Sequence, residues 1–292
     1  MRNFLCVIFS LSAIFPVKSQ LLWEISGKGA KKSYIFGTNH FVSSDFLDSV
    51  PNVYKAYNSS QVVVGEILMS EKNIFDTLMT YAVMPKKIAQ SQLWTEEELA
   101  QVDSALQNTL FLSFRDVATL KPAMISAMYV QAIYEKIFKK KDNFLLDSYF
   151  QHVAEMSGKK ILALESVTEQ AVLLFNNQTL ERQKEILLDV IRDNEKLIQD
   201  IKKNVSVYKS GNIDLLYSEY INDTSKTALY LCEKHDFLDN RNKKWVKKIA
   251  EIIKKDSAFI TVGALHLPSE NGLITRLIKA GYKVKKCSKP VI

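Results

Sequence analysis

The chain has 292 residues, 47% of them hydrophobic, and a formal net charge of +7. A chain of this length can bury a substantial core, and because it contains no linker-like, low-complexity or repeated segment, one compact domain is expected. The positive charge comes largely from lysine pairs on predicted helices, as in KKWVKKIAEIIKK, which we interpret as a solvated helix face. No nucleic-acid motif accompanies these lysines, so no nucleic-acid partner is expected.

The N-terminal segment has the features of a secretory signal peptide. A basic residue precedes an apolar run over residues 4–15, and Val17 and Ser19 have the small-residue spacing that signal peptidase reads. We expect a signal peptide at residues 1–19, with cleavage leaving Gln20 as the first residue of an exported protein, periplasmic or secreted. Removing the two basic residues of this segment lowers the formal charge from +7 to +5. No later stretch is apolar and long enough to cross a bilayer.

Six short stretches rich in Val, Ile, Leu and Phe are predicted to be β-strands. Several are apolar on both faces, as strands covered by helices on each side are. The first two are close enough to form a hairpin, with the turn residues GKGAKK between them. The predicted strands are 21–26, 33–37, 61–67, 159–165, 257–263 and 282–287.

Between the strands, apolar residues recur with helical spacing. A capping box at Thr95 and Glu98 predicts one helix start, Pro122 another, and Gly158 a helix end. Further helices are predicted at 144–157, 179–203, 238–255 and 270–280. The pattern favours an α/β fold in which a central, mostly parallel sheet is flanked by helices. Two helical insertions, roughly 70–140 and 168–256, are expected to cap the C-terminal end of the strands.

Ionisable side chains follow four of the predicted strands at their carboxyl ends. They are His40, Glu66, Glu165 and His266. Because the carboxyl ends of strands in an open α/β sheet line the ligand crevice, we expect these four side chains to converge on one site.

The two histidines of this set share a Gly-x-x-His pattern. Gly37 precedes His40, and Gly263 precedes His266, which allows a tight turn at the strand end before each imidazole. The bland alternative for each is a core or capping histidine bonded to backbone. The two remaining histidines lack the pattern and are predicted to be structural: His152 and His235.

Two imidazoles and a carboxylate are a plausible ligand set for a divalent metal with an open position for water. We predict His40, Glu66 and His266 as the ligands and Glu165 as the proton shuttle. The same groups could work without metal, and the alternative for each buried glutamate is an ion pair with a lysine or arginine. Arg241, with its neighbour Asn242, opens a predicted helix, where its charge could hold substrate or an oxyanion; a surface arginine is the alternative there.

Several segments together resemble the TraB/GumN family over nearly the whole chain after residue 19. They are GTNH, VVVGEI, LLDSYFQHVAEMSGKKILALESVTEQ, the RN of DNRNKKW, and VGALHLPSENGLITRLIKAGYKV, the most specific of the set. That family includes bacterial pheromone-shutdown and GumN-like proteins and is similar to the animal Tiki proteases that inactivate Wnt. The resemblance implies one domain over residues 20–292 with a fold of the Tiki, erythromycin-esterase and ChaN type.

The resemblance also implies a metal-dependent hydrolase site. His40 and His266 match the family's motif histidines, and Glu66, Glu165 and Arg241 match its acids and its RN motif. The resemblance adds Asp147 as a further site residue. Four other residues that accompany the motifs are also expected at the site: Gly37, Asn39, Asn242 and Gly263. Gly65 departs from the aliphatic residues usual before the first acid.

Together these observations predict an exported metal-dependent hydrolase, a peptidase, that uses Mn, Co or Zn and acts on a peptide or a small molecule. One alternative is a metal-independent His/Glu hydrolase of esterase type. The other is a protein that binds haem or a peptide signal without turnover, as the link of ChaN relatives to haem suggests. Whether Cys232 and Cys287 form a disulfide stays open at this point.

Overall fold

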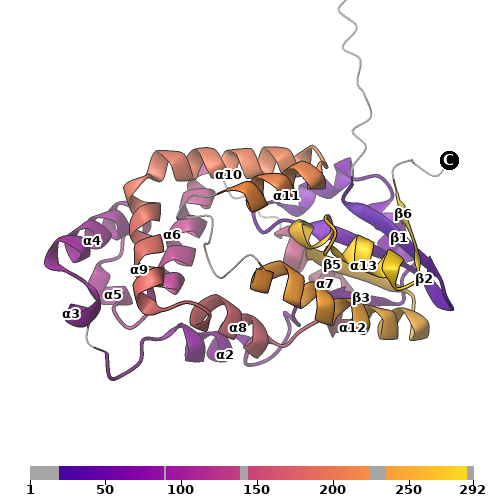
Figure 1. The fold of residues 1–292 in the computed structure, drawn as a ribbon, viewed down its shortest axis with the longest axis horizontal. Helices are drawn as coiled ribbons and strands as arrows, with labels where there is room; N and C mark the ends of the chain where they lie inside the picture. Colours follow the sequence, from indigo (N-terminus) through magenta and orange to yellow (C-terminus); the bar gives the residue numbers. More distant parts are fainter. Residues whose placement is uncertain (1–19, 89, 139–143, 224–234, 288–292) are drawn as a thin grey trace, which may run out of the picture.

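The computed structural model describes residues 20–88, 90–138, 144–223 and 235–287 (Figure 1). The predicted signal peptide lies outside these ranges, and so does Cys232, the proposed partner of the half-buried Cys287. No helix in the described ranges is both long and apolar enough to span a membrane.

The core of the molecule is a six-stranded sheet with the order β4-β3-β5-β2-β1-β6. The strands β4, β3, β5 and β2 run parallel to one another, whereas β1 pairs antiparallel with both β2 and β6. All six predicted strands are present, and the first two form the predicted hairpin. Four strands are shorter than predicted, β1 is shifted by one residue, and β2 is longer. Their bounds are β1 Leu22–Gly27, β2 Ala30–Thr38, β3 Val62–Gly65, β4 Lys160–Ala163, β5 Ala258–Gly263 and β6 Lys283–Lys286.

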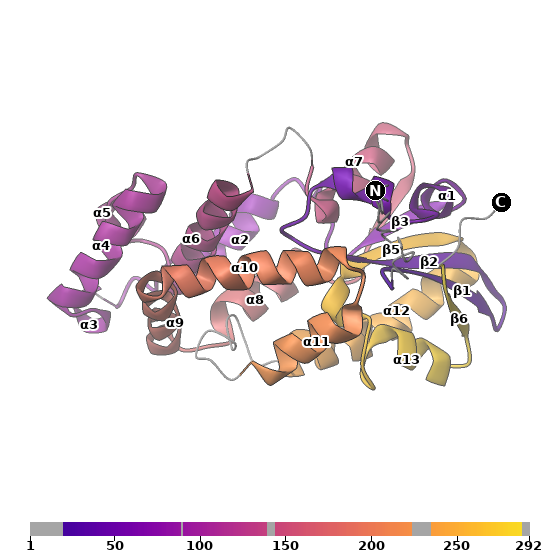
Figure 2. The ribbon, with the colours of Figure 1, turned by 90° about the horizontal axis from the view of Figure 1, so that it is seen from above.

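Helices cover both faces of the sheet, which is why its central strands are apolar on both sides. The helices α1 (Val53–Asn58) and α7 (Leu146–Met156) lie on one face, and α12 (Arg241–Lys255) and α13 (Leu273–Lys279) on the other (Figure 2). Phe150 of α7 packs against Phe259 of β5, with ring centroids 4.6 Å apart, and both are fully buried. This contact fixes α7 on the sheet and thereby positions the side chains at its N-terminus.

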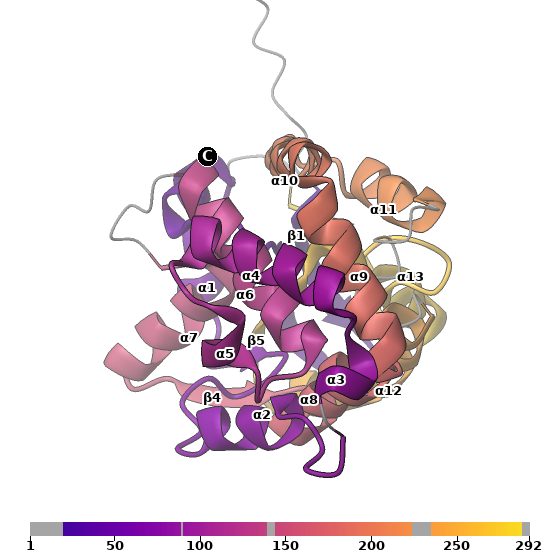
Figure 3. The same ribbon diagram turned by 90° about the vertical axis from the view of Figure 1, so that its left-hand side faces the viewer.

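The remaining helices form a block beyond the end of the sheet at which the parallel strands terminate (Figures 1 and 3). The capping box at Thr95 and Glu98 is present, and Pro122 is the first residue of its helix, as predicted. The larger helices of the block are α2 Ile74–Ala82, α4 Glu96–Leu110, α6 Pro122–Ile137, α8 Val167–Asn176, α9 Leu180–Arg192, α10 Asn194–Lys209 and α11 Ile213–Asn222.

The predicted single helix over 179–203 is wrong, because the chain turns sharply between α9 and α10 (Figure 1). Asp193 leaves the helical conformation at the break, with φ −116° and ψ 57°, and its side chain accepts the N–H of Lys196 to cap α10. A short carboxylate that can cap a new helix competes with continuation of the old one. The apolar stripe continues through the break, and the sequence periodicity therefore did not reveal it.

Candidate functional site

Three of the four predicted strand-end groups meet at a buried arginine. Arg241, the first residue of α12, donates from Nη2 to Glu66, 2.6 Å away, and from Nε and Nη2 to both oxygens of Glu165, at 3.1 and 2.7 Å. Its Nη1 lies 3.0 Å from Nε2 of His266. Residues from three strand ends and one helix start are thus joined by one guanidinium, in line with the predicted convergence.

All the donors of Arg241 are engaged within the protein. A guanidinium has five N–H groups, and the fifth reaches the carbonyl oxygen of Phe237 at 3.3 Å. The ring of Trp245 stacks beneath it, 4.4 Å from Cζ, and the side chain is only 8% exposed. Burial alone would lower the pKa of Arg241, but the two carboxylates outweigh it and raise that pKa. In this arrangement Arg241 orients its neighbours and keeps no donor for a substrate.

Glu66 is held as a carboxylate by its partners. Its Oε2 accepts from Arg241, and its Oε1 accepts the backbone N–H of Gly263 at 2.7 Å. Burial is the largest single effect and would raise the pKa of Glu66, but the charge of Arg241, the two histidines and the Gly263 amide together outweigh it and lower the pKa to about 2. A Cβ added at Gly263 would lie 3.4 Å from Oε1, which is an ordinary van der Waals contact.

The pKa of Glu165 is shifted in the opposite direction to that of Glu66. Burial raises the pKa of Glu165, an effect that its hydrogen bonds from Arg241 only partly offset. The side-chain amide of Gln170, on α8, reaches Oε1 of Glu165 at 3.2 Å and Oε2 of Glu66 at 3.4 Å. The two carboxylates therefore share two donors, Arg241 and Gln170.

His266 is buried as a neutral imidazole. The amide nitrogen of Asn242 donates to two carbonyl oxygens, at 3.4 and 3.1 Å, so its Oδ1 is the acceptor for the Nδ1–H of His266, 2.7 Å away. This assignment leaves Nε2 as the acceptor for Arg241. Burial, and then the charge of Arg241, lower the pKa of His266 to about 3.

The first Gly-x-x-His motif packs directly against the second. A Cβ at Gly37 would lie 2.8 Å from Cδ1 of Leu267 and 3.0 Å from Cα of Ala264, which flank His266. Only a glycine allows β2 to approach the turn after β5 this closely. Tyr208 of α10 also donates to the carbonyl oxygen of Gly37, at 2.7 Å, and ties the helical block to this strand end.

His40 has a different partner from the other three strand-end groups. Its Nδ1 lies 2.7 Å from Oδ2 of Asp147, at the start of α7, and Oδ1 of the same carboxylate accepts a hydrogen bond from the Thr38 hydroxyl. Asp147 raises the pKa of His40, although water screens part of this attraction because the side chain is 69% exposed. Asn39 fixes the turn by accepting the N–H of Phe41 and by donating to Asn204.

A small cavity of about 50 Å³ joins the two parts of the site. Its lining includes His40 and Asp147 together with Glu66 and Gln170. A cavity of this volume can hold a few water molecules. The imidazole of His40 and the carboxylate of Glu66 therefore line one cavity.

The cavity wall also explains the departure at Gly65. The side chain of Gln151, on α7, donates to the carbonyl oxygen of Ile67 and accepts the N–H of Met69, both at 3.0 Å, which holds the segment after β3. A Cβ at Gly65 would lie 2.1 Å from Nε2 of Gln151, so an aliphatic residue there would push the Gln151 amide out of these hydrogen bonds. The sequence shows the glycine at position 65, but it does not show that Gln151 packs against it.

Sequence reasoning missed Thr38, Gln151 and Gln170. A usable signal existed for Gln170, because the Ser166–Glu169 capping box fixes the start of α8 and places it one turn inside the helix. The two histidines predicted to be structural lie outside the network: His152 stacks on Phe144 with centroids 4.2 Å apart, and His235 is exposed.

The predicted metal ligands do not form a metal centre in this arrangement. Nε2 of His266 faces Arg241 and is 4.0 Å from Oε1 of Glu66, while Nδ1 of His40 faces Asp147. In the described part of the chain, no group of three or more His, Cys, Asp or Glu side chains is placed to hold a metal ion. The guanidinium already occupies this place, because it bonds both buried carboxylates and His266, so the set does not fit a divalent cation here.

Comparison with known proteins gives one match. The model of the TraB/PrgY/gumN family matches residues 21–286, which is most of the chain and includes every residue of the site. No curated protein matches the chain. No solved structure matches it either.

Proposed function

The chain belongs to the TraB/PrgY/gumN family, and we propose that it is an exported hydrolase that cleaves peptide or small-molecule substrates with His40 as its acid–base residue. The observation that supports this proposal is the pairing of His40 with Asp147. Because Nδ1 is turned toward the carboxylate, Nε2 is the nitrogen available to the cavity. An imidazole oriented by a carboxylate is the usual arrangement of a histidine that moves protons in hydrolysis.

In the proposed reaction, a water molecule in the cavity attacks the carbonyl carbon of the substrate. Nε2 of His40, in its neutral form, takes the proton of this water, and Asp147 stabilises the imidazolium that forms. Because Asp147 raises the pKa of His40, this step becomes more favourable as the pH rises. The same proton then passes to the leaving group as the bond to the carbonyl carbon breaks. Glu66, fixed by Arg241 and Gly263, contributes a constant negative charge at the cavity wall and an acceptor for the water.

Arg241 takes a positioning role in this proposal. Its five donors hold Glu66, Glu165, His266 and a backbone carbonyl, so it sets the position of the Glu66 carboxylate. Contact of Arg241 with a substrate or an oxyanion stays a prediction, because it requires at least one of these bonds to open.

Activity of matched variants tests the proposal. Hydrolysis of p-nitrophenyl acetate and of a fluorogenic peptide library is measured for the purified protein, and His40→Gln is expected to lower kcat by about 100-fold or more. Asp147→Asn is expected to lower kcat with little change in KM, because it misorients the imidazole. His152→Gln, on the same helix as Asp147, is the control and is expected to retain activity. Equal activity of His40→Gln and the control would refute the acid–base role.

Dependence on Mn, Co or Zn stays a prediction. Hydrolysis that survives exhaustive chelation supports the metal-independent His/Glu mechanism, which the geometry favours. Stoichiometric metal in protein purified without chelator, together with loss of activity on chelation, would instead require a rearranged site. The small cavity does not favour the haem-binding alternative, because a porphyrin needs a far larger apolar slot.

Export is the second part of the proposal. Its support is the N-terminal pattern of residues 1–19, which lie outside the described ranges. N-terminal sequencing of the protein recovered from the exported fraction is expected to begin at Gln20. A chain that retains residues 1–19 in that fraction would contradict the cleavage site.

A further inference from the structure

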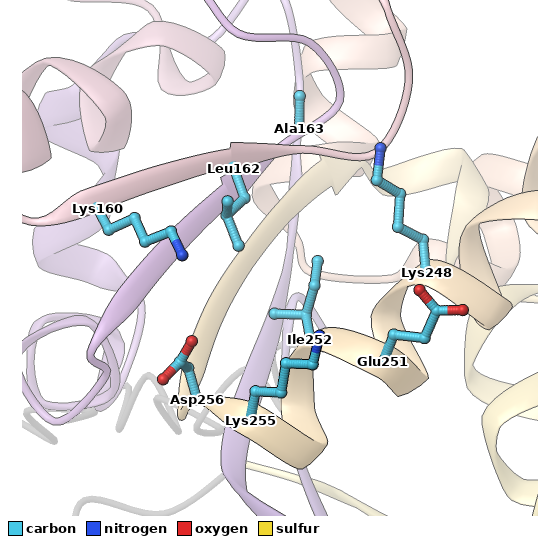
Figure 4. Close-up of a pocket in the computed structure, with 8 residues that line it drawn as sticks. All are labelled: Lys160, Leu162, Ala163, Lys248, Glu251, Ile252, Lys255 and Asp256. Atoms are coloured by element: carbon cyan, nitrogen blue, oxygen red, sulfur yellow. The ribbon is translucent and has the colours of Figure 1, made fainter.

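The edge strand β4 borders an open groove on the face of the sheet that carries α12. Lys160 and Leu162 extend from the strand toward the helix, and Ile252 of α12 lies opposite them (Figure 4). The groove has a volume of about 430 Å³, which lies in the range of ligand sites. Within the described ranges, no strand pairs with the outer edge of β4. Backbone N–H and C=O groups on that edge are thus available to an added strand.

The groove combines an apolar floor with a basic rim. Leu162 and Ile252 are half-buried and provide the floor, whereas Lys160, Lys248 and Lys255 are exposed around it and outnumber the two acids of the lining, Glu251 and Asp256 (Figure 4). None of these three ammonium groups forms an ion pair with another described residue. Unpaired charges beside an apolar strip favour an occupant that brings both acidic and apolar side chains.

The charge of the rim continues along α12. The exposed positions of this helix carry six lysines and one glutamate, a net of five positive charges, and only Lys244 has an acidic partner in the described residues, Glu169 at 3.5 Å. This concentration of one sign on one helix attracts and orients an acidic partner.

We propose that this groove binds an extended acidic segment of a partner protein, which adds to the sheet as a strand beside β4. Its backbone pairs with the free edge of β4. On the face that it turns toward α12, an apolar side chain rests against Leu162 and Ile252, and acidic side chains two residues before and after it meet the lysines of the rim. Strand addition supplies affinity through the backbone, while alternate side chains supply specificity.

A membrane surface fits this part of the molecule less well. Helices that lie on membranes insert large apolar side chains between the lipids, but the apolar residues of α12 point into the protein: Trp245, Ile249 and Ile253 are buried. The lysines of an edge strand also keep uncharged strands from pairing in the wrong place. An acidic segment is the partner for which the same lysines become an attraction.

A labelled ten-residue peptide tests the proposal. It carries Asp, Leu and Asp at successive positions on one face of a strand and Thr at the others, and its binding to the full chain is measured by fluorescence anisotropy. We expect saturable binding that weakens with salt, together with slower hydrogen exchange at the amides of residues 160–163. The same peptide with alternate N-methylated amides is expected not to bind, because it cannot pair with β4.

Matched charge reversals separate this groove from general basicity. The double variant Lys160→Glu/Lys248→Glu is expected to weaken peptide binding by about tenfold or more. The double variant Lys72→Glu/Lys202→Glu makes the same charge change at exposed lysines elsewhere and is expected to bind as the unmodified protein does. Equal loss in both variants, unchanged binding of the N-methylated peptide, or binding only to phosphatidylglycerol vesicles would overturn the proposal.

Discussion

The buried imidazole of His266 predicts that the folded protein loses stability in mild acid. Protonation of His266 would place a second positive charge 3.0 Å from Arg241 and replace the acceptor of that hydrogen bond with a donor. The pKa of His266 is therefore lowered from 6.5 to about 3 in the folded protein, whereas the unfolded chain binds a proton near pH 6.5. The contribution of the neutral imidazole to the free energy of unfolding is therefore present at pH 7 and is lost as the pH falls below 6.5.

The size of this effect follows from the two pKa values. Below pH 6.5 the free energy of unfolding falls by about 1.4 kcal/mol per pH unit until the folded protein also binds the proton near pH 3. Between pH 7 and pH 4.5 the loss that His266 causes is about 2.5 kcal/mol. This is a large part of the 5 to 15 kcal/mol that is roughly typical of a folded domain.

Urea unfolding of the wild-type protein and of His266→Gln, followed by tryptophan fluorescence at pH 7 and pH 4.5, measures this loss. Glutamine keeps a donor and an acceptor but cannot be protonated, so the difference in unfolding free energy between the two proteins is expected to shift by about 2.5 kcal/mol over this range. The raised pKa of Glu165 affects both proteins alike and cancels in the difference. Parallel pH dependences, or an imidazole that titrates near pH 6.5 by NMR, would refute the buried neutral state.

Three further outcomes follow from the same contacts. Arg241→Lys is expected to lower the free energy of unfolding by about 3 kcal/mol or more, because lysine cannot hold two carboxylates at once. Thermal unfolding measures this change. A loss below about 1 kcal/mol would contradict the central role of Arg241 in holding the two carboxylates. Gly65→Ala is expected to cost about 1 to 3 kcal/mol in unfolding free energy through its clash with Gln151, and the added change Gln151→Ser should restore part of it. Burial raises the pKa of Cys287 to about 11. In a Cys232→Ser protein, iodoacetamide should therefore modify Cys287 about 100-fold more slowly at pH 8 than it modifies an ordinary thiol. Equal rates would contradict the burial of this thiol.

The elements of the sheet could be predicted from the sequence because each depends on local composition. Strands that are apolar on both faces, such as β3 and β5, indicate that helices cover both sides of the sheet. The order of the strands could not be derived in the same way. The strand β5 lies between β3 and β2, so its neighbours come from a distant part of the chain, and no local pattern encodes that position.

The convergence of the site residues could be predicted, but their pairing could not. Their positions after strands predicted that Glu66, Glu165 and His266 lie together at the carboxyl ends of the strands, and the structure brings them together at Arg241. The partner of His40 depends on how α7 packs against the sheet through aromatic contacts. The residue pattern predicted that helix, but only the resemblance to the family pointed to Asp147 as a site residue.

The central difference between the sequence-based prediction and the structure is the cation that pairs with the buried acids. Two carboxylates and an imidazole at strand ends require a positive charge, and the sequence allows either a metal ion or an arginine to supply it. In the structure Arg241 supplies it, with every donor used.

A metal ion bound by Glu66 and His266 would have to displace the guanidinium from both residues, and Arg241 would then lose its contacts with them while the stacked Trp245 remained beneath. Added Mn, Co or Zn should therefore change tryptophan fluorescence if the metal uses these ligands. Unchanged fluorescence in the presence of activity would leave the chemistry with His40 and Asp147.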